Sequence, residues 1–138
     1  MNMIRIIVDS TCDMLEKYAE NHHIIVLPLH VLVEGKEYLD GVEISVDEIY
    51  AFMRQGVMPR TSQIGIEETY QVLDHQLAEG NDLFYLSFSS KMSGTYALVN
   101  QIMNELKSKY PENKMIALDG EGGSFATGLI AMHAAEMA

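Results

Sequence analysis

Four short apolar runs rich in β-branched residues constrain the fold of this 138-residue chain more than any other feature. They lie at residues 4–8, 24–27, 83–88 and 115–118, and segments with helical spacing separate them. Nearly continuous apolar runs of this length are typical of buried parallel strands. We therefore predict one α/β domain, 1–138, in which a mostly parallel sheet of about four strands is flanked by helices.

The segments between these runs predict helices, a hairpin and a loop. A Ser45/Glu48 capping box predicts one helix start, and Ser10-Thr11 offers an N-cap to an earlier helix that includes Met14 and Leu15. A small β-hairpin is expected after the second strand, with Gly35 in its turn. The remaining expected elements are helices over 66–77, 92–110 and 124–137, hairpin strands over 29–33 and 37–39, and a loop over 60–65.

The net charge and the cysteine content indicate which binding partners and which cellular compartment to expect. The chain has 20 Asp and Glu residues against 9 Lys and Arg, a formal net charge of −11. An acidic domain is repelled by phosphate backbones and anionic membranes, so we expect no nucleic-acid partner and no stable membrane insertion. A single cysteine, Cys12, fits a reducing compartment, and the apolar runs are too short for a signal peptide or a membrane span. These features predict a cytoplasmic protein.

Small polar residues follow three of the predicted strands. The first strand ends in Asp9-Ser10-Thr11, the third runs through residues 87–90 into 91–96, and the fourth ends in residues 119–124. Thr61-Ser62-Gln63 can fold over the same edge. Ligands of parallel sheets bind at the carboxyl ends of the strands, where hydroxyls and free N–H groups of helix N-termini suit an anionic group. A carboxylate or phosphate ligand is one interpretation, and ordinary helix capping by Ser and Thr is the other.

The sequence contains two weak candidates for a nucleophile. Ser124 lies on a predicted strand-to-helix turn, as in a nucleophile elbow, but only His133 and Glu136 follow it, so the hydrolase order of Ser, acid and His is not met. An N-cap role fits Ser124 better. Cys12 follows a strand near a helix start, where a thiol pKa can fall, although a buried apolar role is commoner. An acyl-transferring or hydrolysing enzyme that uses Cys12 or Ser124 stays an alternative.

Cofactor and metal motifs are incomplete. Residues 120–125 nearly match a dinucleotide fingerprint, but Phe125 replaces its third glycine. Asp9, Asp13 and Asp119 could meet around Mg²⁺, although hydrogen bonding of Asp9 to loop N–H groups and a place for Asp13 in a first helical turn are simpler roles. We expect no cofactor and no metal.

Four segments together resemble the DegV family, the bacterial fatty-acid-binding proteins that serve fatty acid kinase. They are residues 8–13 (VDSTCD), 60–63 (RTSQ), 89–96 (SSKMSGTY) and 118–128. The Thr-Ser-Gln and Ser-Gly-Thr-Tyr segments are the most specific, and the order of the segments covers nearly the whole chain.

The resemblance implies that Thr61 and Ser93 hold the carboxylate of a long-chain fatty acid. A partner fatty acid kinase then phosphorylates that carboxylate to an acyl phosphate, so this chain presents the substrate and performs no chemistry. A binding module for another small anionic ligand is the remaining alternative. The residues expected to support the pocket are Ser62, Gln63, Gly94, Thr95, Asp9 and Ser10.

The chain departs from the family pattern in two places. Ile64-Gly65 stand where Pro-Ser usually follows Thr-Ser-Gln, which loosens that segment. Family members are also about twice as long, so we expect this chain to be the N-terminal domain of a two-domain protein whose C-terminal domain is absent here. The isolated fragment is expected to expose an apolar patch beside its crevice and to bind fatty acid poorly or self-associate.

Overall fold

The computed structural model describes residues 2–138 and contains a four-stranded parallel sheet. Its strands lie in the order β2-β1-β6-β7. They are β1 (Ile4–Asp9), β2 (Ile25–Leu27), β6 (Asp82–Ser87) and β7 (Met115–Asp119). The four predicted apolar strands are thus confirmed, as is the α/β class. Two of the central side chains, Ile7 and Tyr85, are fully buried.

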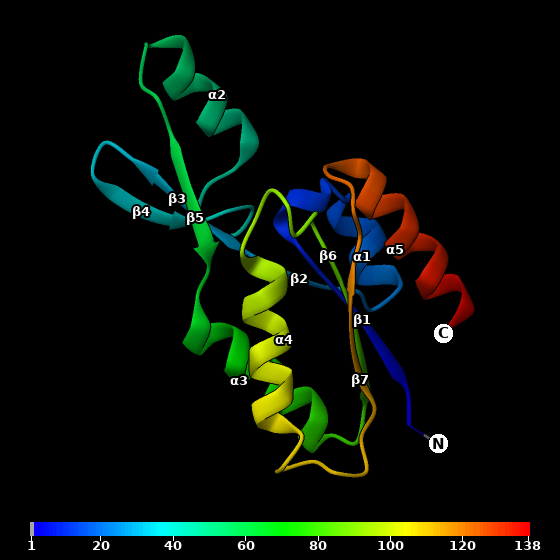
Figure 1. The fold of residues 1–138 in the computed structure, drawn as a ribbon. Coiled ribbons are helices and arrows are strands. Elements are labelled where there is room, and N and C mark those ends of the chain that lie inside the picture. The colour runs from blue at the N-terminus through cyan, green and yellow to red at the C-terminus, as the bar shows by residue number, and fades with distance from the viewer. Residues whose placement is uncertain (1) are drawn as a thin grey trace.

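Helices cover both faces of this sheet (Figure 1). The four are α1 (Glu16–Asn21), α3 (Ile66–Ala78), α4 (Thr95–Leu106) and α5 (Phe125–Met137). Helices α3 and α4 enclose the main apolar cluster with residues such as Leu73, Val99 and Tyr85. On the other face, α1 and α5 close a smaller cluster around Val8 and Ala131. Across residues 2–138, none of the helices is both long enough and apolar enough to cross a membrane.

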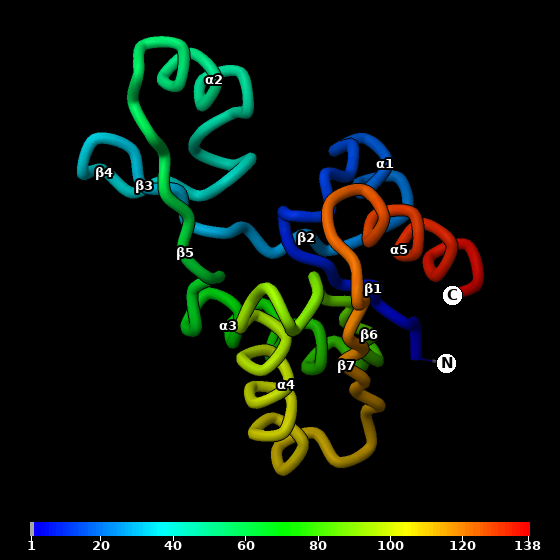
Figure 2. The backbone as a smooth tube through the Cα atoms, turned by 45° about the horizontal axis from the view of Figure 1, so that its top comes forward, coloured from blue at the N-terminus to red at the C-terminus, as the bar shows by residue number. Residues whose placement is uncertain are grey.

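A small second lobe projects from the sheet, as both views show (Figures 1 and 2). It consists of the antiparallel strands β3 (Leu29–Val33), β4 (Lys36–Leu39) and β5 (Arg60–Ile64), in the order β4-β3-β5, with helix α2 (Val46–Arg54). The predicted hairpin is confirmed as β3 and β4, and Gly35 has the positive φ of +80° that its turn requires. The Ser45/Glu48 capping box begins α2 as predicted. A separate apolar cluster, built on Val31, Val33 and Ile44, holds the lobe together.

The prediction of a loop over residues 60–65 is wrong, because Arg60–Ile64 forms strand β5. Its backbone pairs with β3, which lies far away in the sequence. Residues 60–63 of this strand are exposed and polar, and only Ile64 is buried, so the segment lacks the apolar character of the other strands. Long-range backbone pairing, which local sequence does not encode, makes this segment a strand.

The segment after β1 also differs from its prediction. Residues Ser10–Cys12 form a 3₁₀ turn, η1, which Asp9 caps by accepting the N–H of Thr11. Helix α1 begins only at Glu16, after Leu15, so Ser10-Thr11 is not its N-cap. Asp13 ends η1 with a φ of 51° and is not in a first helical turn. The long helix predicted over 92–110 is shorter as well, since α4 spans Thr95–Leu106 and leaves residues 92–94 in the preceding loop.

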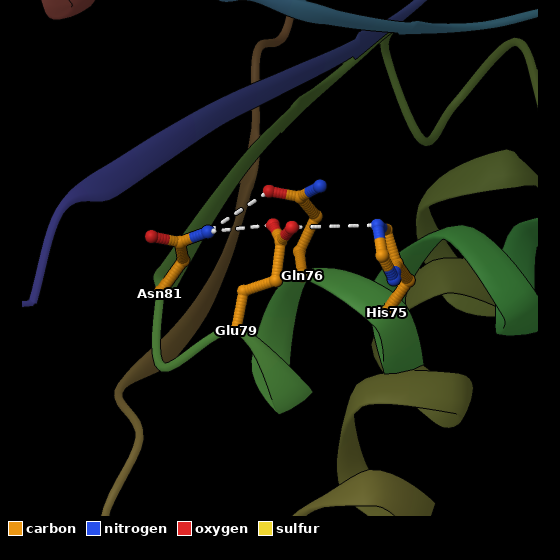
Figure 3. A network of polar contacts seen from close by, with 4 residues as sticks. All are labelled: His75, Gln76, Glu79 and Asn81. Carbon is orange, nitrogen blue, oxygen red and sulfur yellow. Dashed lines mark hydrogen bonds and ion pairs between the residues drawn. The ribbon is translucent and has the colours of Figure 1, made fainter.

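The turn from α3 into β6 is fixed by a polar network (Figure 3). The amide of Asn81, which is buried, donates to Gln76 Oε1 at 3.0 Å and to Glu79 Oε2 at 3.4 Å. His75 Nε2 lies 3.5 Å from Glu79 Oε1. These contacts hold the end of α3 at the start of β6. This is the amino end of the strands, opposite the carboxyl ends where the polar residues lie.

Candidate functional site

A pocket of about 370 Å³ lies where the small lobe meets the carboxyl ends of the central strands. We call it the strand-end pocket. Five of the eight predicted site residues line it, namely Thr61, Ser62, Gln63, Ser93 and Gly94. The other lining residues are Thr11, Leu29, Phe88 and Met92. Thr61 and Ser93, far apart in the sequence, therefore share one pocket.

Strand β5 forms one wall of the strand-end pocket and carries a β-bulge there. Ser62 pairs with His30 and Ile64 pairs with Leu29, which leaves Gln63 without a partner on β3. A bulge of this kind bends the strand and redirects a side chain. The amide of Gln63 consequently lies over Gly94, at a place that a side chain on residue 94 would occupy.

The loop between β6 and α4 forms the opposite wall and carries Ser93. The Ser93 hydroxyl oxygen accepts the N–H of Thr95 at 3.2 Å and lies 2.9 Å from the Thr95 hydroxyl. If Thr95 donates in the second contact, both lone pairs of Ser93 are used and its own proton is free to face a ligand. Helix α4 begins directly after this loop, and the N–H groups of its first turn that follow Thr95 have no partner within the helix.

Asp119, at the end of β7, holds this loop in place. Its carboxylate accepts the N–H of Ser90 at 3.1 Å and the Ser90 hydroxyl, and it also accepts the N–H of Glu121 at 3.0 Å. These hydrogen bonds, led by that of the Ser90 hydroxyl, lower the pKa of Asp119. A further backbone bond joins Ser89 N–H to Gly122 O at 2.8 Å. The loop after one strand therefore positions the loop that carries Ser93.

Three predicted site residues do not line the strand-end pocket. Asp9 is 1% exposed and accepts the N–H of Thr11 at 3.0 Å, as expected of its loop role, together with the hydroxyls of Thr11 and Tyr85. Ser10 Oγ accepts the backbone N–H of Leu29 at 3.1 Å. Thr95 is also buried and contacts Ser93. Asp9 and Thr95 are thus buried, whereas the half-buried Ser10 joins the turn after β1 to the start of β3.

Thr11 lines the strand-end pocket but is not among the predicted carboxylate-binding or supporting residues. The sequence predicts Thr11 as a polar residue at the end of the first strand and as part of a helix cap, and the structure places it in the lining of the strand-end pocket, on the 3₁₀ turn after β1. The sequence feature that indicates a site role for Thr11 is its place among the polar residues that follow a buried strand.

The two candidate nucleophiles lack activating partners. Cys12 is buried, and this burial raises the pKa of its thiol to about 11, so the thiolate is scarce at neutral pH. Ser124 occupies the N-cap position of α5, as predicted, but its hydroxyl donates to Asp13 and makes no capping bond. A carboxylate alone, with no imidazole between, does not reproduce a triad.

A larger hollow of about 910 Å³ runs beside α1, β2 and the start of α2. It contains Ser10 and Cys12 but neither Thr61 nor Ser93. Its walls include the acidic side chains of Asp13, Glu16, Glu20 and Asp40. Arg5 and His23 also line this hollow, but the four acidic side chains outnumber them and repel a carboxylate, so the smaller strand-end pocket is the better candidate for an acid.

Comparison with the sequences of known proteins shows to which family this chain belongs. The sequence profile of the DegV family, described as uncharacterised proteins, matches residues 3–138. The chain belongs to the DegV family. A DegV domain-containing protein of Caldanaerobacter subterraneus is 31% identical over 138 residues, which are 100% of this chain and 48% of that protein. Another, from Clostridium perfringens, is 33% identical and is covered to 48% of its length. This DegV chain thus spans about half the length of the curated relatives it matches.

Solved structures of DegV proteins share the fold. A stearic acid-binding protein from Eubacterium ventriosum superposes with a TM-score of 0.91 at 26% identity, over 98% of this chain and 47% of that one. A DegV lipid-binding protein from Thermotoga maritima gives a TM-score of 0.81 at 31% identity, over 98% and 48% of the two chains. A DegV fatty acid-binding protein from Bacillus subtilis gives 0.86 at 25% identity, over 99% and 48%. The structural neighbours of this DegV chain therefore include fatty-acid-binding proteins.

Proposed function

We propose that this chain binds a long-chain fatty acid, with the acid's carboxyl group in the strand-end pocket, and presents that group to a partner fatty acid kinase. The observation that carries the proposal is the meeting of Thr61 and Ser93 in one pocket from two separate lobes. Hydroxyl donors bind a carboxylate well and introduce no competing base.

The expected role of each polar group follows from its place. Thr61 and Ser93 donate hydrogen bonds to the carboxyl oxygens, while the Gln63 amide and the first turn of α4 provide further N–H donors. Gly94 leaves room for Gln63, and Ser62 lies between the two donors of β5. Asp9, Ser10 and Thr95 support these residues from below.

The apolar walls of the pocket suit only the start of an acyl chain. Leu29, Phe88 and Met92 lie beside the hydroxyls. Each methylene removed from water contributes about 0.8 kcal/mol, so a long chain needs apolar walls along most of its length. We infer that this chain is the N-terminal domain of a two-domain protein and that the second domain encloses the rest of the acyl chain.

The apolar surface near α5 and β7 agrees with a covering partner. Phe125, Leu129 and Ile130 of α5, and Ile116 and Leu118 of β7, are all exposed large apolar side chains. A second domain covers this surface in the two-domain protein, and another copy of the chain covers it when the domain is isolated.

In this proposal the protein is a substrate-presenting cytoplasmic subunit and not an enzyme. The partner kinase supplies ATP, a carboxyl oxygen of the acid forms the new bond to the γ-phosphorus, and ADP leaves. The raised pKa of Cys12 and the contact of Ser124 with Asp13 argue against covalent acyl chemistry on this chain.

Lipid extraction of the purified protein, followed by mass spectrometry, tests the proposal. A long-chain fatty acid recovered in near-stoichiometric amount is expected from the two-domain protein. Recovery of a different small anion would replace the fatty acid, and covalent labelling by an acyl-mimic probe would favour the enzyme alternative. Addition of the kinase and ATP should yield acyl phosphate only when the presenting protein is present.

A further inference from the structure

One solvent-exposed methionine forms part of the wall of the strand-end pocket. Met92 lines the pocket, directly before Ser93 in the chain, and is 73% exposed. The four other exposed methionines of residues 2–138, none of which lines the pocket, are Met3, Met53, Met58 and Met137. The side chain of Met92 is therefore within reach of both a bound ligand and a reagent in solvent.

A hydrogen-bonded turn fixes the backbone of Met92. The N–H groups of Met92 and Ser93 both donate to the carbonyl oxygen of Ser89, at 2.9 and 3.0 Å. The N–H of Ser89 in turn donates to the carbonyl oxygen of Gly122 at 2.8 Å. Met92 is consequently held next to the residue whose hydroxyl the proposed function assigns to the carboxyl group of the acid.

The pocket offers a carboxylate only neutral donors. Among residues 2–138, no Lys, Arg or His contributes to its lining. The donors of the proposed function are hydroxyl and amide groups, such as those of Ser93 and Gln63. Hydrogen bonds from such groups are weaker than those from a cation, so a new acceptor in the same wall competes with the ligand for them.

Oxidation of a methionine provides such an acceptor. Hydrogen peroxide transfers one oxygen atom to the sulfur: the S–O bond forms, the O–O bond breaks, and both peroxide protons leave in a water molecule. The sulfur is oxidised and the peroxide is reduced. The sulfoxide is polar and its oxygen accepts hydrogen bonds, so the change also removes an apolar wall beside the start of the acyl chain.

We propose, on the basis of the proposed function, that Met92 is an oxidation site whose sulfoxide weakens the binding of the fatty acid's carboxyl group. A carboxyl group that is presented to a kinase is open to solvent, and Met92 beside it is then open to a small oxidant. Cys12, the lone thiol of the chain, is buried and therefore protected. Reduction by a methionine sulfoxide reductase restores the thioether and with it the binding.

Peroxide treatment of the full-length, two-domain protein tests this proposal. The affinity for one long-chain fatty acid should fall about fourfold or more after treatment, the equivalent of about one buried methylene group. Met92→Leu forms no sulfoxide at this position, so its own affinity should be the same before and after treatment. Met58→Leu is the matched control, because it removes a methionine that is 78% exposed outside the pocket lining, and it should stay as sensitive as wild type.

Peptide mass spectrometry locates the added oxygen. In the ligand-free protein, Met92 and Met58 should both gain an oxygen atom. Saturation with the fatty acid should slow the reaction at Met92 several-fold and leave the reaction at Met58 unchanged. Met92→Gln, which makes the wall permanently polar without any oxidant, should bind the acid more weakly than Met92→Leu.

Three results would overturn the proposal and leave fatty-acid binding intact. They are a native protein in which peroxide does not oxidise Met92, an affinity that is unchanged after Met92 is fully oxidised, and an equal loss of affinity in Met92→Leu, which would place the oxidised group elsewhere. Failure of the untreated two-domain protein to bind any long-chain fatty acid would overturn the proposed function as well.

Discussion

The side-chain amide of Gln63 lies over the bare backbone of Gly94, so the two lobes touch at the strand-end pocket. An ideal Cβ on residue 94 would collide with Gln63 Nε2, the flexible tip of that side chain. The φ of Gly94 is −78°, which any residue adopts, so the glycine is needed for space and not for conformation.

Gly94→Ala should therefore displace Gln63 without unfolding the protein. We expect a melting temperature within a few degrees of wild type and an affinity for decanoate that falls several-fold, because Gln63 no longer reaches the pocket. Gly122→Ala is the matched control, since a Cβ there has its nearest neighbour at 3.7 Å. If Gly94→Ala binds as tightly as wild type, Gln63 takes no part in the site.

Ser93→Ala should weaken fatty-acid binding far more than it lowers the melting temperature. A hydrogen bond to a charged group is worth about 1.5–3 kcal/mol, or about one to two decades of affinity. The measurement is calorimetric titration of the full-length, two-domain protein, as wild type and as the variant, with one long-chain fatty acid. Ser108→Ala makes the same change in the exposed turn that follows α4 and should bind like wild type. Equal affinities for all three proteins would reject Ser93 as a ligand donor.

The loop that carries Ser93 should loosen in acid. Hydrogen bonds from Ser90 and Glu121 favour the ionised form of Asp119 and lower its pKa in the folded protein. The stabilisation is therefore present above the ordinary aspartate pKa of about 3.9 and disappears as the pH falls through the lowered value. The Ser90 amide resonance should report this transition.

Asp119→Asn should abolish the titration of the Ser90 amide and reduce ligand affinity. The ion pair between Lys109 and Asp74, 2.7 Å apart, lies near the other end of α4 and should keep its own acid titration in the variant. A Ser90 amide that still titrates in Asp119→Asn would show that another group holds the loop.

Cys12 should resist alkylation in the folded chain. Burial raises its pKa to about 11, against about 8.5 for a free thiol, and also blocks access. Iodoacetamide at pH 7 should react at least about a hundredfold more slowly than with the denatured chain, with free cysteine as the rate standard. Rapid labelling of the native protein would revive the thiol-enzyme alternative.

The sequence predicts the central sheet well because its strands are nearly continuous apolar runs, as residues 4–8 illustrate despite Arg5. It does not predict β5, since Thr61, Ser62 and Gln63 are exposed and their pairing partner on β3 is distant in the chain. The bulge at Gln63 depends on the register between these strands, which only the folded protein defines. The sequence does not assign Thr11 to the site for a similar reason, because Asp9, which holds it, is itself fixed by Tyr85 of the neighbouring strand.

The separate apolar cluster of the small lobe, around Val31, Val33 and Ile44, has a consequence for ligand binding. Two independently packed bodies form the strand-end pocket, so an occupant of the pocket also fastens one body to the other. A bound ligand therefore makes it harder to separate the two bodies. By thermodynamic linkage, the free energy that the ligand adds to their docking equals the free energy that their docking adds to ligand binding. Val33→Ala would make a cavity in the small lobe, at a residue outside the lining of the strand-end pocket. The variant should accordingly bind the fatty acid with lower affinity.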